Sequence, residues 1–245
     1  RNVTASQGQS NLVGKLLLKG ELVCETPLIM GSGDREEESD LVVLKDEHGK
    51  PFIPATAFVG ALRQHFFRNV VLNEVDREQI AYFWGAWPGA AEKDLLQSAF
   101  SVQDLYPVHE VQVKVRDGVR IDPRTSTATE RAKYDYEVVE PPAVFCLKAE
   151  VTLRAAFKKE WFIAIIQYLI QALEQGKISL GAMTTKGFGR CRLKNPRLNH
   201  YDYTNKEAVL AWFGEGDPVS IPIHTWDGPV LKEKEVQDFF LDAHF

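Results

Sequence analysis

Alternation of apolar and polar residues predicts several β-strands. It is strictest over residues 147–154, where every second side chain is apolar. A similar alternation predicts a first strand over residues 12–25. Two shorter apolar runs, at residues 41–44 and 99–105, predict further short strands.

Helical periodicity appears in three places. Apolar side chains recur every three or four positions over residues 159–175, and Gly176 marks the end of that helix. A second helix is predicted over residues 57–69, with Thr56 as its N-cap. A third, shorter helix is expected within residues 75–87.

The segment 114–140 has few large aliphatic residues and many Arg, Thr and Ser residues, so it can bury little surface. Its ends, Gln112 to Ile121 and Lys133 to Val139, have the pattern of the two arms of a β-hairpin. The predicted order is then β-β-α, β, hairpin, β-α-β. This order predicts an α+β fold.

The charge is distributed unevenly along the 245 residues. The net charge of −5 does not by itself indicate a nucleic-acid partner, but residues 181–197 contain five Lys or Arg residues and no acid. Residues 198–245 instead carry nine acids against three lysines. We therefore expect a basic patch and an acidic, aromatic C-terminal extension on one chain.

The cysteines and the apolar runs exclude some classes of protein. Cys24, Cys146 and Cys191 are far apart in the sequence without a CxxC motif, so neither a disulfide framework nor a zinc site is expected, and all three are predicted to be buried. The histidines show no metal-ligand spacing. No apolar run reaches transmembrane length and no signal peptide is seen, which predicts a cytoplasmic protein without membrane contact.

An acidic segment follows the glycine turn at residues 31–33. Glu36, Glu37 and Glu38 would repel RNA unless a divalent cation is bound, so this cluster either recruits a metal or is a solvated tip. Asp40 and Asp34 are the carboxylates that could hold a cation or accept a proton. Asp46, in contrast, is expected to shape the turn in which it lies.

A second candidate site is the glycine-rich, basic stretch from residue 181 to residue 190. Small residues allow backbone N–H groups to approach a phosphate, and Lys186 and Arg190 would neutralise its charge. The alternative is a plain tight turn before an edge strand. The GxxxxGK[ST] spacing of a P-loop is absent.

Three stretches resemble one family. KDEHGKPFIPATAFVGALR (residues 45–63) is similar to a RAMP-family segment that usually contains IPGSSLKGxxR; Pro54, Gly60 and Arg63 are retained. RIDPRTSTA followed by YDYEVV resembles the family's thumb hairpin, and GFGR (residues 187–190) resembles its C-terminal glycine-rich signature. The chain is closest in these features to the backbone subunit of type III CRISPR effector complexes.

The resemblance implies a ferredoxin-like (RRM-like) core sheet over residues 1–197, with a thumb inserted at about residues 112–140, followed by the extension 198–245. It also implies binding of guide RNA and metal-dependent cleavage of target single-stranded RNA, with Mg²⁺ or Mn²⁺ held by Asp40. Further implied partners are other CRISPR effector subunits, including copies of this or related RAMP proteins. The implied RNA contacts are Gly31, Ser32, Thr56, Arg63, Arg120, Arg124, Thr125, Thr127, Lys186, Gly187, Gly189 and Arg190.

Asp40 occupies the place of the family's catalytic aspartate, and Asp34 is the second candidate. Three hypotheses remain open at this point. The chain is a guide-bound subunit that also cleaves target RNA, or an inactive RNA-binding scaffold or capping subunit of the same complex, or an unrelated α+β enzyme that holds a metal in its acidic loop.

Overall fold

The fold is seen in a computed structural model, which describes residues 11–31, 42–72, 77–91, 97–121, 128–214, 219–223, 225 and 227–234. Within these ranges, the side chains of residues 119–121, 128–133 and 211 are not described.

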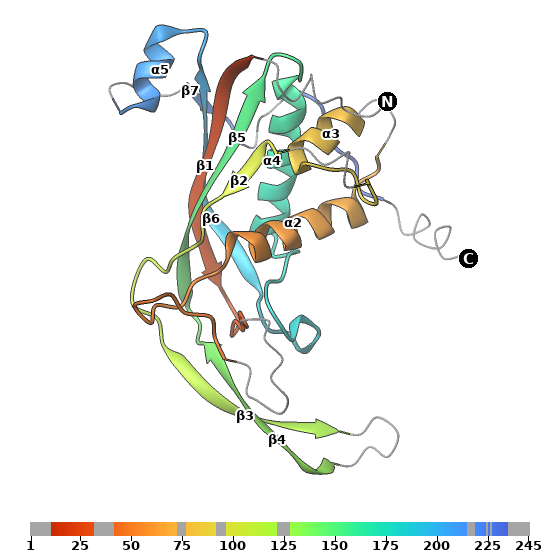
Figure 1. The fold of residues 1–245 in the computed structure, drawn as a ribbon, viewed down its shortest axis with the longest axis vertical. Helices are drawn as coiled ribbons and strands as arrows, with labels where there is room; N and C mark the ends of the chain where they lie inside the picture. Colours follow the sequence, from red (N-terminus) through yellow and green to blue (C-terminus); the bar gives the residue numbers. More distant parts are fainter. Residues whose placement is uncertain are drawn as a thin grey trace, which may run out of the picture.

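A five-stranded antiparallel sheet forms the centre of the molecule (Figure 1). Strand β1 (Leu12–Cys24) is its middle strand and pairs with β5 (Ala143–Arg154) and β6 (Cys191–Asp202). The edges are β2 (Phe100–Val102), beside β5, and β7 (Val219–Ile221), beside β6. The strict alternation of the sequence gives β5 one buried face and one open face, as predicted.

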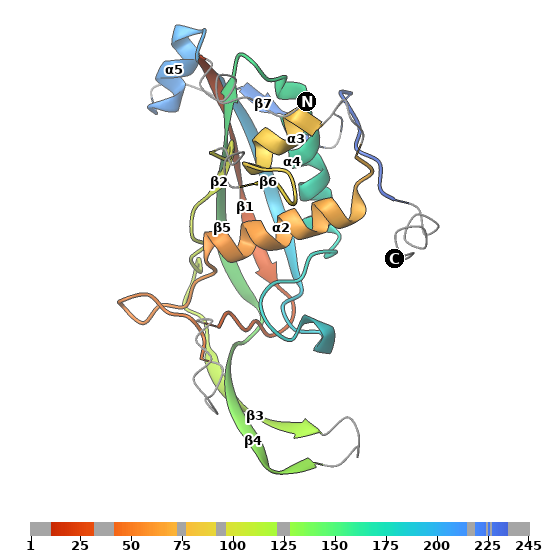
Figure 2. The ribbon, with the colours of Figure 1, turned by 45° about the vertical axis from the view of Figure 1, so that its right-hand side comes forward.

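Three helices cover one face of this sheet: α2 (Ala55–Asn69), α3 (Arg77–Trp84) and α4 (Lys159–Glu174) (Figures 1 and 2). Helix α4 is apolar on most sides and is buried along its length, and the backbone leaves the helix at Gly176 with φ 67°. The core between the helices and the sheet includes Phe58, Leu62, Phe66, Phe83, Phe145 and Phe162, all nearly inaccessible to solvent. The architecture is therefore α+β and compatible with the expected ferredoxin-like core.

The start of α2 differs from the prediction. Its N-cap residue is Pro54, and Thr56 lies in the first turn, exposed and without a capping hydrogen bond. The carboxylate of Asp104, from the segment after β2, instead accepts a hydrogen bond from the backbone N–H of Ala55 at 2.7 Å. Proline lacks a side-chain acceptor, so the capping group comes from a distant part of the chain.

The apolar run at residues 41–44 does not form a regular strand. Its described part makes only an isolated antiparallel bridge, between Val43 and Gly31, and the chain bridges again between Lys45 and Pro51. Two prolines close by, Pro51 and Pro54, lack the N–H groups that a longer ladder needs. The segment is a loop pinned at isolated points.

Strands β3 (Val113–Ile121) and β4 (Ala128–Val139) pair with each other as a separate antiparallel hairpin, as the two arms were predicted to do. The hairpin projects from one end of the molecule (Figure 1). Gly118 lies opposite Tyr134, and any Cβ at Gly118 would collide with that ring. At its base, β4 bridges to Leu28 through Val139, which ties the hairpin to the loop after β1.

The C-terminal part contributes to the same sheet. Strand β6 continues to Asp202, so the expected boundary at residue 197 lies inside a strand, and β7 pairs with β6. Helix α5 (Lys206–Trp212) lies over one end of the face opposite α4, where Trp212 packs against Leu17 and Tyr201. Among the helices that the structure describes, none is both long and apolar enough to span a membrane.

Two of the three cysteines meet. Cys24 and Cys191 are buried directly opposite each other on β1 and β6, with 3.0 Å between their Sγ atoms. The hydrogen bond with Cys24, together with burial, raises the pKa of the Cys191 thiol far above its ordinary value. Cys146 is exposed, contrary to the prediction, because it points to the open face of β5.

Candidate nucleic-acid interface

Three loops that are distant in the sequence meet at the base of the hairpin. The loop after β1 exchanges two backbone hydrogen bonds with β4, between Leu28 and Val139, at 3.0 and 2.9 Å. The glycine-rich loop packs on the same segment, because the N–H of Gly189 donates to the carbonyl of Pro27 at 2.8 Å. The loop that follows the acidic segment reaches β4 through Val43. This convergence brings Gly31 and the glycine-rich loop, two of the stretches with predicted contacts, to the base of the hairpin.

The acidic segment begins and ends beside this hairpin base. Gly31, exposed, bridges to Val43, and the N–H of Leu44 donates to the carbonyl of Met30 at 2.7 Å. The two described ends of the segment are therefore held side by side. The predicted residues Ser32, Asp34 and Asp40 themselves lie outside the described residues.

Glu137 of β4 connects the returning end of the acidic segment to the hairpin. Its carboxylate accepts a hydrogen bond from the backbone N–H of Val43 at 3.1 Å and pairs with Lys45 Nζ at 3.0 Å. Just beyond, Asp46 Oδ1 accepts hydrogen bonds from the N–H groups of His48 and Lys50, at 3.0 and 2.8 Å. Asp46 therefore shapes its turn, as predicted.

The N–H groups in the last half of the glycine-rich loop are hydrogen-bonded within the protein rather than open to a ligand. A short 3-10 turn (Thr184–Lys186) is followed by Gly187 and Gly189, with φ 85° and 72°. A Cβ at Gly189 would collide with the carbonyl of Leu180, so this position requires glycine. The N–H groups of residues 186–190 all donate within the protein. Phosphate contacts by these five amides, which the sequence suggested, would require those bonds to break.

The side chains of the glycine-rich loop remain available. Lys186 and Arg190 are both exposed, and neither is in an ion pair with any described residue. Gly187, next to Lys186, faces open space. Phe188 makes an edge contact with Tyr136 of β4, with 6.2 Å between ring centroids. The loop thus places two cations beside the hairpin.

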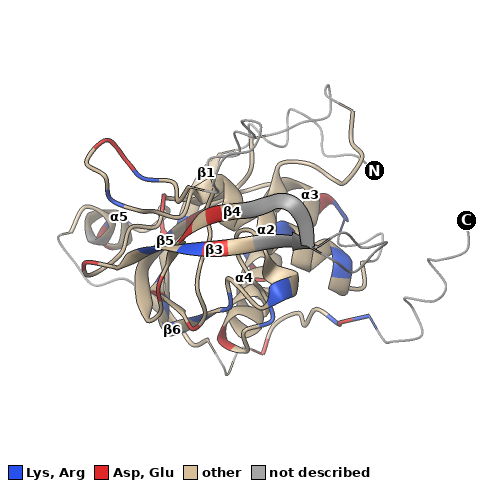
Figure 3. Ribbon diagram, turned by 90° about the horizontal axis from the view of Figure 1, so that it is seen from below, with Lys and Arg blue, Asp and Glu red and all other residues tan. Residues whose placement is uncertain are grey.

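Charges on the described part of the hairpin are mixed (Figure 3). Arg116 of β3 forms a two-pronged ion pair with Glu140, at 2.8 and 3.0 Å from Nη2 to the two carboxylate oxygens. Arg120 lies near the end of β3, where the backbone alone is described. Arg124, Thr125 and Thr127 lie outside the described residues.

Two other predicted RNA contacts lie elsewhere, on α2. Arg63 donates a hydrogen bond to the carbonyl of Ala86 at 3.1 Å and lies over the ring of Phe67. It is half-buried in the contact between α2 and the segment after α3. Thr56, exposed at the start of α2, is free of that contact. The structure therefore does not bring Arg63 into direct contact with the glycine-rich loop.

The fit of a divalent cation rests on donor chemistry. The acidic segment supplies several carboxylates, which are the hard oxygen donors that Mg²⁺ and Mn²⁺ prefer. Within the described ranges, no group of three or more His, Cys, Asp or Glu residues is placed to hold a metal. Asp34 and Asp40, the ligands that the sequence predicts, lie outside these ranges.

Sequence reasoning missed two residues, one at this region and one at the start of α2, that join distant segments of the chain. In the sequence, Glu137 stood out only as part of the YDYEVV motif. Its contact with Val43 joins two residues that are 94 positions apart. Asp104 lies at the end of a predicted strand and gave no sign that it caps α2, 49 positions earlier. Both contacts depend on tertiary structure, so local patterns could not reveal them.

Comparison with known proteins agrees with this geometry. The model of the RAMP superfamily matches residues 21–192, which include the loop after β1, the hairpin and the glycine-rich loop. A search of curated proteins found no match to the chain. Because the family match covers well over half of its length, the chain belongs to the RAMP superfamily of CRISPR-associated, RNA-binding proteins.

Proposed function

We propose that the chain is a backbone subunit of a type III CRISPR ribonucleoprotein, which binds guide RNA and cleaves complementary target RNA. One observation supports this most strongly. The two ends of the acidic segment and the glycine-rich loop are both anchored at the base of the projecting hairpin, by Val43 to Glu137 and by Gly189 to Pro27. The described ends of the acidic segment, two exposed cations and a protruding hairpin thus meet in one region.

Guide RNA would be held mainly by charge. Lys186 and Arg190 are exposed next to small residues, which lets a phosphate backbone approach closely. The internal hydrogen bonds of the loop keep these two side chains on a rigid support. Contacts to phosphates carry no sequence information, so the chain would accept guides of unrelated sequence.

Target cleavage would use the RNA's own 2′-hydroxyl. The 2′-oxygen bonds to the adjacent phosphorus, the bond from phosphorus to the 5′-oxygen breaks, and the leaving oxygen takes a proton. This leaves a cyclic 2′,3′-phosphate and a 5′-hydroxyl. Asp40, with Asp34 as the alternative, would accept the 2′-OH proton or hold Mg²⁺ or Mn²⁺. The ion, when bound, supplies charge stabilisation at the phosphate.

The hairpin would set where cleavage occurs. A β3–β4 pair that projects from the body is suited to lie across a guide–target duplex and interrupt it at intervals. Glu137 would keep the acidic segment next to this interruption. Other effector subunits, including further copies of this chain or related RAMP proteins, would continue the ribonucleoprotein on either side.

Guide binding can be tested with the purified full chain and a fluorescent guide RNA over a range of salt concentrations. Counterion release predicts that the logarithm of the binding constant falls linearly with the logarithm of the salt concentration. For single strands the slope is about −0.7 per neutralised phosphate. The double variant Lys186→Ala/Arg190→Ala should therefore make the slope shallower by about 1.4 and weaken binding to all guides alike. Lys206→Ala/Lys232→Ala, which removes two exposed cations from the C-terminal part, is the matched control.

A slope and affinity unchanged in the glycine-loop variant would contradict the proposed guide contact. So would a strong preference among unrelated guide sequences. Isolation of the native complex, followed by sequencing of its RNA, tests the assignment to a CRISPR ribonucleoprotein: short RNAs that share repeat-derived ends are the expected result.

A further inference from the structure

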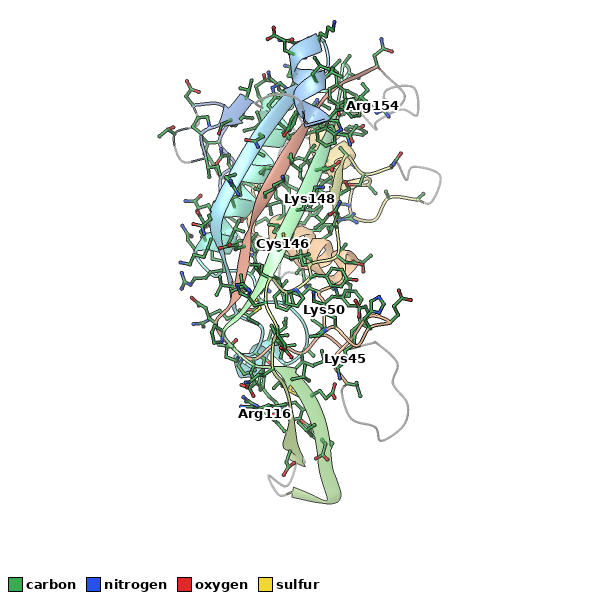
Figure 4. All side chains as sticks on the ribbon, turned by 90° about the vertical axis from the view of Figure 1, so that its left-hand side faces the viewer. Lys45, Lys50, Arg116, Cys146, Lys148 and Arg154 are labelled. Atoms are coloured by element: carbon green, nitrogen blue, oxygen red, sulfur yellow. The ribbon has the colours of Figure 1, made fainter. Side chains whose placement is uncertain are left out.

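The face of the sheet opposite the helices is largely uncovered. Figure 4 shows this face, with β5, β1 and β6 running side by side. Helix α5 covers only the end where Trp212 meets Leu17 and Tyr201. The alternation along β5 directs Cys146 and Lys148 onto this open face, while Leu147 between them is buried.

A row of three cations crosses the open face. Lys19 of β1 lies directly opposite Lys148 of β5 on one side and Arg197 of β6 on the other. Neighbouring strands are about 4.8 Å apart, so the backbones that carry these charges span about 10 Å. Lys19 and Arg197 are exposed, Lys148 is half-buried, and none is in an ion pair with a described residue.

Such an arrangement does not stabilise the sheet. Like charges directly opposite each other on paired strands repel and cost stability. Neither of the nearby acids forms an ion pair with the row: Glu150 pairs with Lys15 at 2.8 Å, and Glu21 accepts a hydrogen bond from Asn195 at 2.9 Å. An anionic ligand across the row would remove the cost.

Aromatic rings lie at the edge of the same face. Tyr106 stacks on Phe52, with 5.5 Å between ring centroids, and is 37% exposed. Lys50 Nζ lies 5.9 Å from the Tyr106 ring centroid. The carbonyl of Tyr106 accepts a hydrogen bond from the N–H of Cys146 at 2.9 Å, which fixes the ring pair beside β5. Figure 4 shows Lys50 near Cys146 and Lys148.

We propose that this open face is a second RNA-binding surface, which holds a single-stranded segment with its phosphates on Lys19, Lys148 and Arg197 and a base against Tyr106. Cations beside an exposed aromatic ring are the combination that binds single strands without sequence preference. The choice of RNA over an acidic protein rests on the RNA-binding function of the chain. The surface is separate from the glycine-rich loop, which packs beyond the end of the sheet.

The chain carries its own reporter for this surface. Cys146 is exposed on β5, two positions from Lys148, whereas Cys24 and Cys191 are buried. The test measures the rate of Cys146 alkylation by iodoacetamide in the full chain, with and without a fluorescent single-stranded RNA of mixed sequence. At RNA concentrations of about ten times the Kd, mass action predicts that alkylation slows by about tenfold.

Two sets of variants separate this surface from the proposed guide contact. Lys19→Ala/Lys148→Ala/Arg197→Ala should abolish the protection of Cys146 and make the salt slope of RNA binding shallower by about 2. Because it removes a repulsion, this variant should melt no lower than the wild type. Lys186→Ala/Arg190→Ala should leave the protection of Cys146 intact, whatever it does to guide binding.

Three results would overturn the proposal. The first is unchanged alkylation of Cys146 at saturating RNA. The second is protection that persists in the triple variant or, as an independent check, is no weaker in the single variant Lys148→Met than in the wild type at an RNA concentration near the Kd. The third is equal protection by polyaspartate at the same charge concentration, which would assign the face to an acidic protein instead of RNA.

Discussion

The carboxylate of Glu137 in β4 accepts a hydrogen bond from the backbone N–H of Val43, with 3.1 Å between Oε2 and the nitrogen. This contact joins the hairpin to the point where the chain returns from the acidic segment. In the proposed function this link would matter, because cleavage at a fixed position would require the carboxylate and the duplex interruption to be placed together.

Glu137→Ala should reduce target cleavage by about tenfold to a hundredfold without changing guide binding, because a small displacement of a catalytic group has effects of this size. The measurement is the single-turnover cleavage rate of the assembled complex at equal RNA occupancy. Glu47→Ala is the matched control, since Glu47 is 86% exposed and contacts only His48 among described ion-pair partners. A rate equal in Glu137→Ala and the control would show that the link has no role in positioning.

Asp104→Ala should lower the free energy of unfolding by about 1 kcal/mol, because it removes the only capping carboxylate described at the start of α2. Thr56→Ala, one residue after the capped Ala55, should change it by a few tenths of a kcal/mol at most. Urea denaturation of both variants measures the difference. If Thr56→Ala is the more damaging change, the capping assignment is wrong.

The contrast between Thr56 and Asp104 illustrates how far the sequence could predict the fold. Periodicity located β1, β5 and α4 closely, because each is long and its apolar pattern reflects one buried face. It failed at residues 41–44, where a short apolar run forms an isolated bridge instead of a strand. Short runs contain too few residues for a period to be distinguished.

The site was predictable only in part. Glycine spacing marked the loop that carries Lys186 and Arg190, and the residue pattern of the two arms marked the hairpin. The sequence did not show that the loop's amides bond to Pro27 and Thr26, because those partners lie more than 160 positions away. The sequence also could not show that Lys19, Lys148 and Arg197 form one row, because the register between the strands decides which residues lie opposite each other.

A hydrogen-bonded chain anchors the last described segment to the helices. Asn69 Nδ2 can donate to Nδ1 of His65, His65 Nε2 lies 3.3 Å from the hydroxyl of Tyr168, and that hydroxyl donates to Glu233 at 3.4 Å. Lys177 pairs with Glu233 at 2.9 Å. A neutral His65 that accepts at Nδ1 and donates at Nε2 fits this pattern, and burial lowers the pKa of His65 below its ordinary 6.5.

The wild type should therefore lose stability as the pH falls. A histidine with a lowered folded-state pKa binds fewer protons than in the unfolded chain, so its contribution is present above pH 6.5 and is lost below it. The hydrogen bond from Lys177 lowers the pKa of Glu233 below its ordinary 4.5. The stability that Glu233 contributes is therefore also lost as the pH falls, but only below pH 4.5. The melting temperature should drop less between about pH 7.5 and about pH 5.5 in His65→Gln than in the wild type. His48→Gln, at an 80% exposed position, should behave as the wild type does.

Replacement of residues 122–132 by a short Gly-Ser turn should leave the core folded and abolish cleavage at regular intervals. None of the described residues in this segment belongs to the hydrophobic core between the sheet and the helices, and their strand pairing is within the hairpin. Circular dichroism would verify folding, and mapping of target cleavage products would show their spacing. Products at unchanged positions would mean that the hairpin does not set the cleavage interval.

Cleavage of target RNA by the assembled complex, with Mg²⁺ or Mn²⁺, tests the proposed function most directly. Wild type, Asp34→Ala and Asp40→Ala are compared at equal RNA occupancy, together with a target that carries a 2′-deoxy sugar at the scissile position. Asp40→Ala should lower the rate by about 10²-fold or more while target binding is unchanged, and the deoxy target should resist the wild type. Loss in Asp34→Ala alone would move the role to Asp34. Unchanged cleavage in both variants would contradict the account and leave the chain as an RNA-binding scaffold.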